Sequence, residues 1–348
     1  MPGSTSCKLH KIPLMISLFC LIFMISSCTS AVETTTVEGF FFDTFVSIVI
    51  YDSCDAAISD GCIELCSYYD NLFSKSVPES DIYRINHSGG AAVTVSEDTV
   101  FLLSEAIRYA ELTDGKIDPT IETVSSLWDF HPSGMPEVPD ASEIASALTH
   151  VDYRNIRIAP SQTLTGSPTV ALTDPESSLS LAFLAKGYIA DKLKEYLLAG
   201  GIQNAIINLG GNTVVLGSKP GDEPFTVGVE KPFGDGVPIA RFALTDCTLV
   251  TSGVYHRCFY DGDTLYHHIL DASTGYPVEN HLYSVSILAG NSENASLTSD
   301  ALSTTCFVLG PDEGMKLIEA TDSVEAMFIL DDGSIQYSSG FPKPLPED

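Results

Sequence analysis

The stretch from Tyr266 to Gly310 constrains the fold of this chain most strongly, because it combines strand, turn and helix patterns in close succession. Apolar and polar residues alternate over Asp263–Leu270, which predicts a half-buried strand. The Asp-Ala-Ser-Thr-Gly segment that follows is rich in turn residues, and Tyr283–Ala289 has the composition of a second strand. His268 and Asp271 are therefore predicted at a strand end, where side chains reach a cleft.

The helix predicted after these strands carries two oxygen ligands on one side. Apolar residues from Ala301 to Leu309 have helical spacing, and Asp300 and Thr304 share one side of its predicted first turn. A carboxylate and a hydroxyl in this arrangement suit Mg²⁺, which prefers oxygen ligands and keeps several waters. Spacing alone leaves a second interpretation open, in which Asp300 is a charge favoured by the helix macrodipole and Thr304 is a back-bonded core hydroxyl.

Length and charge limit the function classes. The 348 residues are ample for a large core, in one elaborate α/β domain or in about two or three average domains. The formal net charge of −29 argues against nucleic-acid binding, because a phosphate backbone needs a basic surface. The same charge argues against membrane binding by electrostatics alone.

The amino terminus has the pattern of a secretion signal. Lys8 and Lys11 precede a short uncharged apolar run that is too short to span a bilayer. The run ends in Ile-Ser-Ser-Cys, which resembles a bacterial lipobox and predicts a signal peptide over 1–27 with lipidation of Cys28; an ordinary signal peptide is the alternative. Residues 28–38, rich in Thr and Glu, would then form a solvated membrane tether outside the cytoplasm. The six later cysteines show no paired spacing, so the sequence assigns no disulfide.

Strand and helix patterns alternate irregularly along the rest of the chain, and no period of about 20–50 residues repeats. This predicts an α+β fold with a mixed, largely antiparallel sheet, flanking helices and a deep cleft. Predicted strands are Gly39–Tyr51, a pair within Tyr153–Asp174, Ala205–Leu209, Phe225–Pro232 and Arg241–Leu244; predicted helices are Asp55–Phe73, Asp98–Thr113 and Ser142–Leu148.

Several short blocks carry a family resemblance that runs from about Phe42 to Gly310. Lys116-Ile117-Asp118-Pro119-Thr120, Ala185-Lys186-Gly187-Tyr188 with Asp191, Leu209-Gly210-Gly211-Asn212, Thr251-Ser252-Gly253 and His268-Ile269-Leu270-Asp271 all match it, as do Asp300 and Thr304. Together they are similar to the ApbE family, the magnesium-dependent FAD:protein FMN transferases found outside the cytoplasm. The resemblance predicts one ApbE-like domain over residues 39–340.

The chain departs from the family pattern at a few positions. Ser76 stands where many relatives have a Tyr that packs on the flavin ring. Ser180 replaces an Asp, and Ala182 and Phe183 replace a pair of small residues. Asp43 replaces the Gly of a Met-Gly-Thr block, in which Phe42 takes the place of the Met. These departures leave the individual FAD contacts open.

The resemblance assigns site residues position by position. It implies that His268 is the catalytic base, rather than His267, which on a strand would face the opposite side; imidazole ordinarily titrates near neutral pH. Mg²⁺ would be held by the backbone carbonyl of Phe183, Asp300 and Thr304. The implied FAD-binding residues are Phe42, Ser76, Lys116, Ile117, Asp118, Ser180, Lys186 and Leu270.

The implied reaction moves the FMN half of FAD onto a Thr or Ser hydroxyl of an acceptor protein and releases AMP. The implied acceptors are flavoproteins of extracytoplasmic electron-transfer complexes with FMN-binding domains, although the sequence does not identify one. Two alternatives stay open. Water could replace the acceptor hydroxyl, which would make the protein an FAD pyrophosphatase, or the departures could leave a flavin-binding lipoprotein without turnover.

Overall fold

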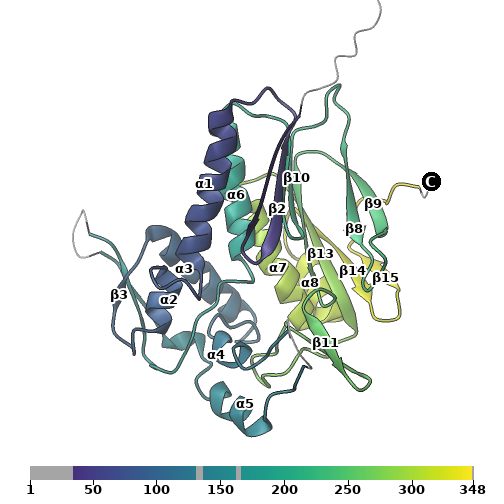
Figure 1. Cartoon of the computed structure of the whole chain (residues 1–348). Helices are drawn as coiled ribbons and strands as arrows, with labels where there is room; N and C mark the ends of the chain where they lie inside the picture. The colour runs from purple at the N-terminus through teal and green to yellow at the C-terminus, as the bar shows by residue number, and fades with distance from the viewer. Residues whose placement is uncertain (1–33, 131–135, 162–165, 347–348) are drawn as a thin grey trace, which may run out of the picture. The chain divides into compact units, whose positions relative to one another are not determined.

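The structure, a computed structural model, describes residues 34–130, 136–161 and 166–346 (Figure 1). The predicted signal peptide, Cys28 and the first part of the predicted tether lie outside the described residues. The end of the tether prediction is wrong, because Thr35–Glu38 belong to strand β1 (Thr35–Phe41). This segment pairs with β2 (Thr44–Ile50) and buries Val37, so the folded domain begins before residue 39.

The prediction of a single strand over Gly39–Tyr51 is also wrong, because β1 and β2 form a hairpin. The turn consists of Phe42 and Asp43, both with a φ of 56°. Positive φ at both central residues is the conformation of a type I′ hairpin turn, which usually takes Gly or Asn. Asp70 steadies the turn by accepting a hydrogen bond from the Phe42 amide at 2.9 Å. Asp43 thus has a left-handed backbone at the position where the family pattern has Gly.

The predicted α+β fold is confirmed. An eight-stranded sheet has the order β1-β2-β6-β7-β10-β13-β14-β15, and each pairing between its strands is antiparallel. Apolar residues that face both sides explain why the central strands are buried. The remaining strands of the sheet are β6 (Ala205–Leu209), β7 (Asn212–Leu216), β10 (Cys247–Gly253), β13 (Leu282–Gly290), β14 (Val324–Leu330) and β15 (Ile335–Tyr337).

The two faces of the sheet bury different layers, as Figure 1 shows. Helices α1 (Ala56–Phe73), α6 (Ala185–Ala199) and α7 (Ala295–Leu309) cover one face, and the hairpin of β8 (Phe225–Glu230) and β9 (Pro238–Leu244) covers the other. Successive strand residues divide between the layers: Val214 and Phe328 pack under the helices, whereas Val215 and Met327 pack under the hairpin. Burial of each large side chain stabilises the sandwich by about 1.5–3 kcal/mol.

Local signals define the helix starts. Asp55 caps α1 and Ser96 caps α3 (Glu97–Leu112), each with its side chain accepting a backbone N–H.

The six cysteines within the described residues are free thiols. In the same part of the chain, no helix is long and apolar enough to cross a membrane. The other elements are α2 (Asp81–Asn86), β3 (Val93–Thr94), α4 (Glu122–Ser125), α5 (Ala141–Leu148), a 3₁₀ turn (Tyr153–Asn155), β4 (Ile156–Ala159), β5 (Thr169–Leu172), β11 (Cys258–Asp261), β12 (Thr264–His267) and α8 (Pro311–Glu319).

Candidate active site

Helix α7 places Asp300 deeper in the protein than its sequence position indicated. The helix begins at Ala295, after Asn294 in a left-handed conformation, so Asp300 lies in the second turn rather than the predicted first. Its side chain is buried, with a relative exposure of 3% for the residue. A charge placed only to complement the macrodipole would lie in the first turn near solvent. Asp300 therefore needs another reason to be buried.

Helix α6 supplies the partner of this carboxylate. The Gly187 amide donates a hydrogen bond of 2.9 Å to Oδ2 of Asp300. A Cβ at Gly187 would lie 2.3 Å from the carbonyl oxygen of Ser296 and 2.7 Å from the Asp300 Cβ, so only glycine fits against α7. The glycine therefore makes room for a neighbouring helix.

The same hydrogen bond leaves a backbone carbonyl free at the start of α6. In a regular helix the Gly187 amide would donate to the carbonyl of Phe183, four residues earlier. It donates to Asp300 instead, and Tyr188, the next residue, already bonds to the carbonyl of Leu184. Among the described residues no hydrogen bond to the Phe183 carbonyl is found. Because the Gly187 amide bonds to Asp300, the carbonyl oxygen of Phe183 stays available to a ligand.

The electrostatics of Asp300 fit a cation. Burial raises the pKa of its carboxyl, while the Lys186 charge, the Gly187 amide and the Asn212 side chain oppose that rise. Asn212 is itself buried and accepts a hydrogen bond from the Ser296 hydroxyl at 3.0 Å. Burial of a carboxylate costs free energy, and a bound cation would offset the part of that cost which these groups leave.

Thr304 lies one turn after Asp300 and has a partner that the sequence did not reveal. Its hydroxyl is 3.1 Å from the hydroxyl of Ser252, which also contacts Ser303 at 2.7 Å. Ser252 lies in β10, and the strand directs its side chain toward α7. In the sequence, the Thr-Ser-Gly block was the only signal that pointed to Ser252. Its place in a strand depends on pairing with β13, which is distant in the chain.

The donor set is compatible with Mg²⁺. Within the described residues no group of three or more His, Cys, Asp or Glu side chains could hold a metal, so a zinc-like site does not occur there. One carboxylate, one hydroxyl and one carbonyl give hard oxygen donors and leave positions for water or phosphate, which is how Mg²⁺ is commonly bound. The buried carboxylate of Asp300 and the free carbonyl of Phe183 meet this test.

The two histidines occupy different environments, as predicted for adjacent strand residues. His267 is buried: its Nε2 lies 3.1 Å from the Val278 carbonyl, and its Nδ1 accepts the Ile269 amide at 3.3 Å. His268, just past the end of β12, has Nδ1 3.3 Å from the Arg257 carbonyl. Both ring nitrogens of His267 therefore have protein partners, whereas Nε2 of His268 has no hydrogen-bond partner among the described residues.

The expected near-neutral titration of His268 is wrong. Burial, followed by the charges of Arg257, His267 and Lys186, lowers its pKa to about 3. The imidazole is therefore neutral across the physiological range and can accept a proton. Lys186 affects the pKa of His268 and that of Asp300, so its charge acts on both groups.

The predicted turn after the histidines is present. Oδ1 of Asp271 accepts the amide and the hydroxyl of Ser273 at 2.7 and 2.5 Å, and the Gly275 amide donates to the Asp271 carbonyl at 2.8 Å. Leu270 is buried and bridges Pro277. The Trp128 indole donates to the Gly275 carbonyl at 3.1 Å, which fixes the turn from the side.

Comparison with known proteins identifies the family of the chain. The model of the ApbE family matches residues 42–328. The chain belongs to the ApbE family. Two relatives, each named FAD:protein FMN transferase, come from Treponema pallidum (30% identity; 97% of this chain and 95% of the relative) and Klebsiella pneumoniae (32%; 82% and 86%). These names confirm the prediction of a transferase.

Solved structures of the family share the fold. The ApbE protein of Thermotoga maritima superposes with a TM-score of 0.77 at 30% identity, covering 88% of this chain and 97% of that one. The flavin transferase ApbE of Vibrio cholerae gives a TM-score of 0.75 at 27% identity, covering 89% and 98%. The predicted ApbE-like domain is therefore confirmed.

In this ApbE-family chain, Asp118 has a structural role that its motif did not indicate. Oδ1 accepts the amide and hydroxyl of Thr120 at 2.8 and 2.6 Å, and Oδ2 accepts the Tyr153 amide at 2.8 Å. Burial raises the pKa of this carboxyl, and the three hydrogen bonds oppose the rise. The adjoining Pro119 carbonyl accepts the Ser180 amide at 2.8 Å, which ties this loop to the segment before α6. A ligand contact by Asp118 stays a prediction.

The remaining predicted flavin residues lie on separate elements of the ApbE fold. Phe42 is half-buried against the core, Ile117 is buried and Lys116 is exposed. Ser76 is exposed, with its hydroxyl 3.2 Å from that of Ser74. No contact among the described residues joins Ser76 or Lys116 to the cluster of Asp300, so their roles stay predictions.

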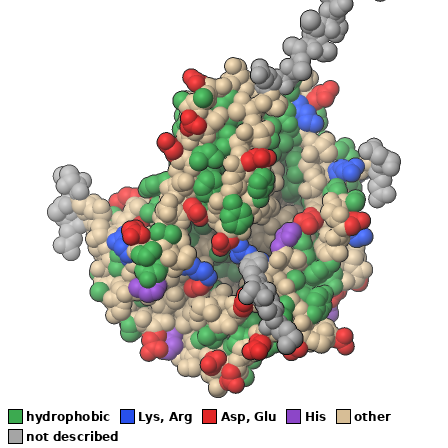
Figure 2. All heavy atoms as spheres, viewed as in Figure 1, with side chains coloured by type: hydrophobic (Ala, Val, Ile, Leu, Met, Phe, Trp, Pro, Cys, Tyr) green, Lys and Arg blue, Asp and Glu red, His purple; other side chains and the backbone are tan. Residues whose placement is uncertain are grey.

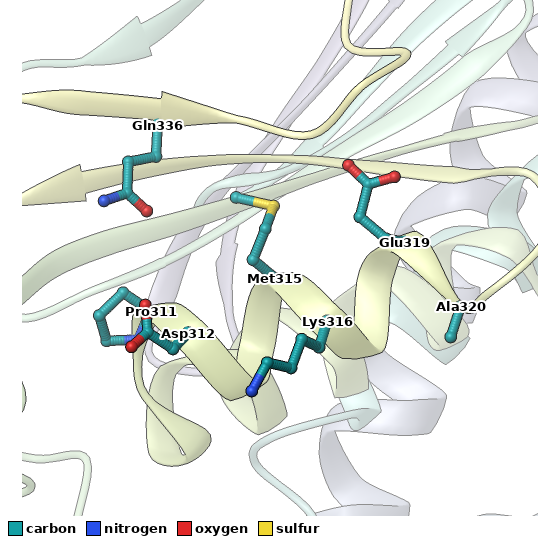
Figure 3. Close-up of a pocket in the computed structure, with 7 residues that line it drawn as sticks. All are labelled: Pro311, Asp312, Met315, Lys316, Glu319, Ala320 and Gln336. Atoms are coloured by element: carbon teal, nitrogen blue, oxygen red, sulfur yellow. The ribbon is translucent and has the colours of Figure 1, made fainter.

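The surface of the protein has two separate concave regions. Figure 2 shows a hollow near the middle of one face, with basic, acidic and His side chains along its edge. Figure 3 shows a different cavity of about 540 Å³, between α8 and β15, that contains none of the predicted site residues. The deep cleft of the fold prediction stays a prediction. The cavity in Figure 3 is lined by Pro311, Asp312, Met315, Lys316, Glu319, Ala320 and Gln336.

Proposed function

We propose that this chain is a Mg²⁺-dependent FAD:protein FMN transferase that modifies a Thr or Ser hydroxyl of an acceptor protein and releases AMP. The observation that carries the proposal is the buried Asp300 carboxylate, held by the Gly187 amide beside the free carbonyl of Phe183. Relatives named FAD:protein FMN transferase support the choice of substrate. A lone buried carboxylate and neutral oxygens suit a metal that completes its shell on a substrate diphosphate.

The proposed donors are Asp300, Thr304 and the Phe183 carbonyl. Mg²⁺ held there would neutralise charge on the diphosphate and on the leaving AMP oxygen. Ser252 orients the Thr304 hydroxyl through the contact of 3.1 Å. Gly187 orients the carboxylate, and Lys186 adds a positive charge that acts on the same region.

His268 would take the proton of the acceptor hydroxyl. In the proposed step the hydroxyl oxygen bonds to the FMN phosphorus, the bond from that phosphorus to the AMP-bridging oxygen breaks, and AMP departs with the electron pair. The neutral imidazole is in the state that accepts the proton. Its Nδ1 faces the Arg257 carbonyl, which leaves Nε2 as the accepting atom.

Incubation of the mature protein with FAD and MgCl₂ tests the proposal. With a folded FMN-binding acceptor domain, we expect flavin fluorescence on the acceptor and one AMP per flavin attached. An acceptor with its target hydroxyl residue replaced by Ala is the matched control and should stay unlabelled. Free FMN in equal amount with and without the acceptor would identify an FAD pyrophosphatase, and unchanged FAD would identify a binding protein; either result contradicts the proposal.

We also propose that the enzyme is anchored outside the cytoplasm through Cys28, next to membrane-bound acceptors. The support is the Ile-Ser-Ser-Cys pattern at the end of the apolar leader. In metabolic labelling with a fatty acid, the wild type is expected to carry label and Cys28→Ala to carry none, because the acyl acceptor is removed. A Cys20→Ala variant, changed within the same leader, serves as the control and should be labelled normally. Equal labelling of Cys28→Ala would refute the anchor.

A further inference from the structure

The packing of α6 on α7 includes a second polar contact, one turn away from the hydrogen bond between Gly187 and Asp300. Oδ2 of Asp191 accepts the backbone amide of Leu297 at 2.9 Å. Oδ1 of Asp191 accepts the Lys194 ammonium at 3.0 Å, and the same ammonium donates to the Ser292 carbonyl at 2.9 Å. Asp191 and Lys194 are both buried, with relative exposures of 1% and 7%. The mechanism proposed above uses neither side chain.

The amino terminus of α7 depends on this contact. The first N–H groups of a helix have no partner within the helix, and a capping side chain ordinarily accepts one of them. Asn294 at the cap position makes no such hydrogen bond, and the first turn of α7 has no acidic residue. Asp191 supplies the missing acceptor from the neighbouring helix, and its negative charge suits the positive end of the α7 dipole.

The two contacts together fix α7 in rotation and in translation. Gly187 and Asp191 are four residues apart on α6, and Leu297 and Asp300 are three apart on α7, so the contacts lie side by side. Apolar packing holds α7 against its neighbours, and the two polar contacts add directional constraints to that packing. The bond from Lys194 to Ser292 extends the attachment to the segment before α7.

We propose that Asp191, paired with Lys194, is a positioning residue that holds α7 so that Asp300 and Thr304 meet the Phe183 carbonyl in metal-binding geometry. This inference rests on the proposed function, because it assumes the metal site at Asp300. Outer partners that orient metal ligands influence affinity strongly, and their loss commonly weakens metal binding by about 10–100-fold. Asp191 acts here through a helix rather than through direct contact with the ligand.

The test measures Mn²⁺ binding by electron paramagnetic resonance of the free ion, together with thermal unfolding without metal. Asp191→Ala is expected to weaken binding about 10–100-fold. Because this variant leaves Lys194 buried without its partner, the double variant Asp191→Ala/Lys194→Met is measured as well. It removes both charges, so it should fold more readily and still show weakened binding.

A matched control exists on α2. Asp81 is buried, pairs with Arg84 three residues later, and accepts the Ser96 amide at 2.8 Å at the start of α3. It therefore makes the same kinds of contact as Asp191 at a different helix junction, with the difference that Arg84 is partly exposed and Lys194 is buried. Asp81→Ala and Asp81→Ala/Arg84→Met should lower the unfolding temperature and leave Mn²⁺ affinity within about twofold of the wild type, since α7 is undisturbed.

Asp300→Ala separates the two levels of the proposal. If Asp300→Ala loses Mn²⁺ binding and both Asp191 variants bind as tightly as the wild type, the positioning role is refuted while the metal site stands. If the Asp81 variants lose as much affinity as the Asp191 variants, the effect is general destabilisation, which also refutes the positioning role. If Asp300→Ala binds Mn²⁺ like the wild type, the metal site of the proposed function is refuted, and the inference is refuted with it.

Discussion

Asp300→Ala is expected to lower Mg²⁺-dependent turnover by about 10³-fold or more while the protein still folds. Asp300 is the only charged group in the proposed donor set, and metal stabilisation of developing charge contributes several kcal/mol to the transition state. The variant loses the hydrogen bond from the Gly187 amide, which costs about 0.5–1.5 kcal/mol. Removal of a buried carboxylate whose pKa is raised by burial offsets part of that cost. Initial rates against MgCl₂ concentration, together with unfolding temperatures, measure both effects.

Asp300→Asn is the control that separates charge from shape. An amide oxygen can still accept the Gly187 N–H, so the packing of α6 on α7 should persist and the unfolding temperature should change less than in Asp300→Ala. Turnover should nevertheless stay low, because the neutral side chain is a much poorer ligand for a hard cation. Wild-type rates for Asp300→Asn at ordinary Mg²⁺ concentrations would show that the carboxylate charge is not needed and would remove the metal assignment.

The sequence predicts those parts of the fold that have local signals. The helices at Asp55–Phe73 and Asp98–Thr113 are found within a residue or two, because each combines a capping side chain with helical spacing. The turn between β1 and β2 was missed because Phe42 and Asp43 are not the Gly or Asn residues that mark such turns. Their left-handed backbone is held by Asp70, which lies on a distant helix and gives no local signal.

In the candidate site, too, the sequence identified residues in local motifs but not the contacts that depend on distant elements. Family motifs selected Lys186, Gly187 and Asp300, but not the reason for the glycine, which is the backbone of α7 lying against it. Spacing could not show that α7 starts early enough to bury Asp300. It also could not show that Ser252 meets Thr304, since the two are brought together by packing of α7 on β10. Burial of a charged group depends on elements that are remote in sequence.

The pKa of His268 is a further property that only the folded arrangement determines. Burial comes first, and the Arg257 and Lys186 charges add to it, lowering the pKa to about 3. Residues 186 and 257 are far apart in the chain. The sequence therefore assigned the imidazole an ordinary pKa, which the structure corrects, while its role as the base stays a prediction.

His268→Ala is expected to lower the chemical step by about 10²–10⁴-fold, the usual contribution of a positioned general base. Affinity for Mn²⁺ and for FAD should change little, because the proposed metal donors and Lys186 stay in place. Single-turnover transfer to the acceptor measures the chemical step apart from product release. His267→Gln is the matched control: His267 contacts the Val278 carbonyl and the Ile269 amide, so its loss should lower stability with a much smaller effect on the transfer rate.

The pH dependence of the transfer rate also tests whether His268 is the base. The lowered pKa of His268 determines the direction of the expected change. A base is lost as pH falls through its folded pKa, so kcat/KM of the wild type should show no inflection from His268 near pH 6.5. The unfolded chain binds protons that the folded protein excludes below that pH, so stability also declines toward acid, and rates must be compared where the protein is folded. A bound diphosphate would neutralise the Lys186 charge, the smallest of the causes that lower the pKa of His268 after burial, Arg257 and His267. The inflection in kcat should therefore lie at higher pH than that in kcat/KM, and His268→Ala should abolish it. If His268→Ala keeps the wild-type rate and pH profile, the acceptor proton goes elsewhere and His268 is not the base.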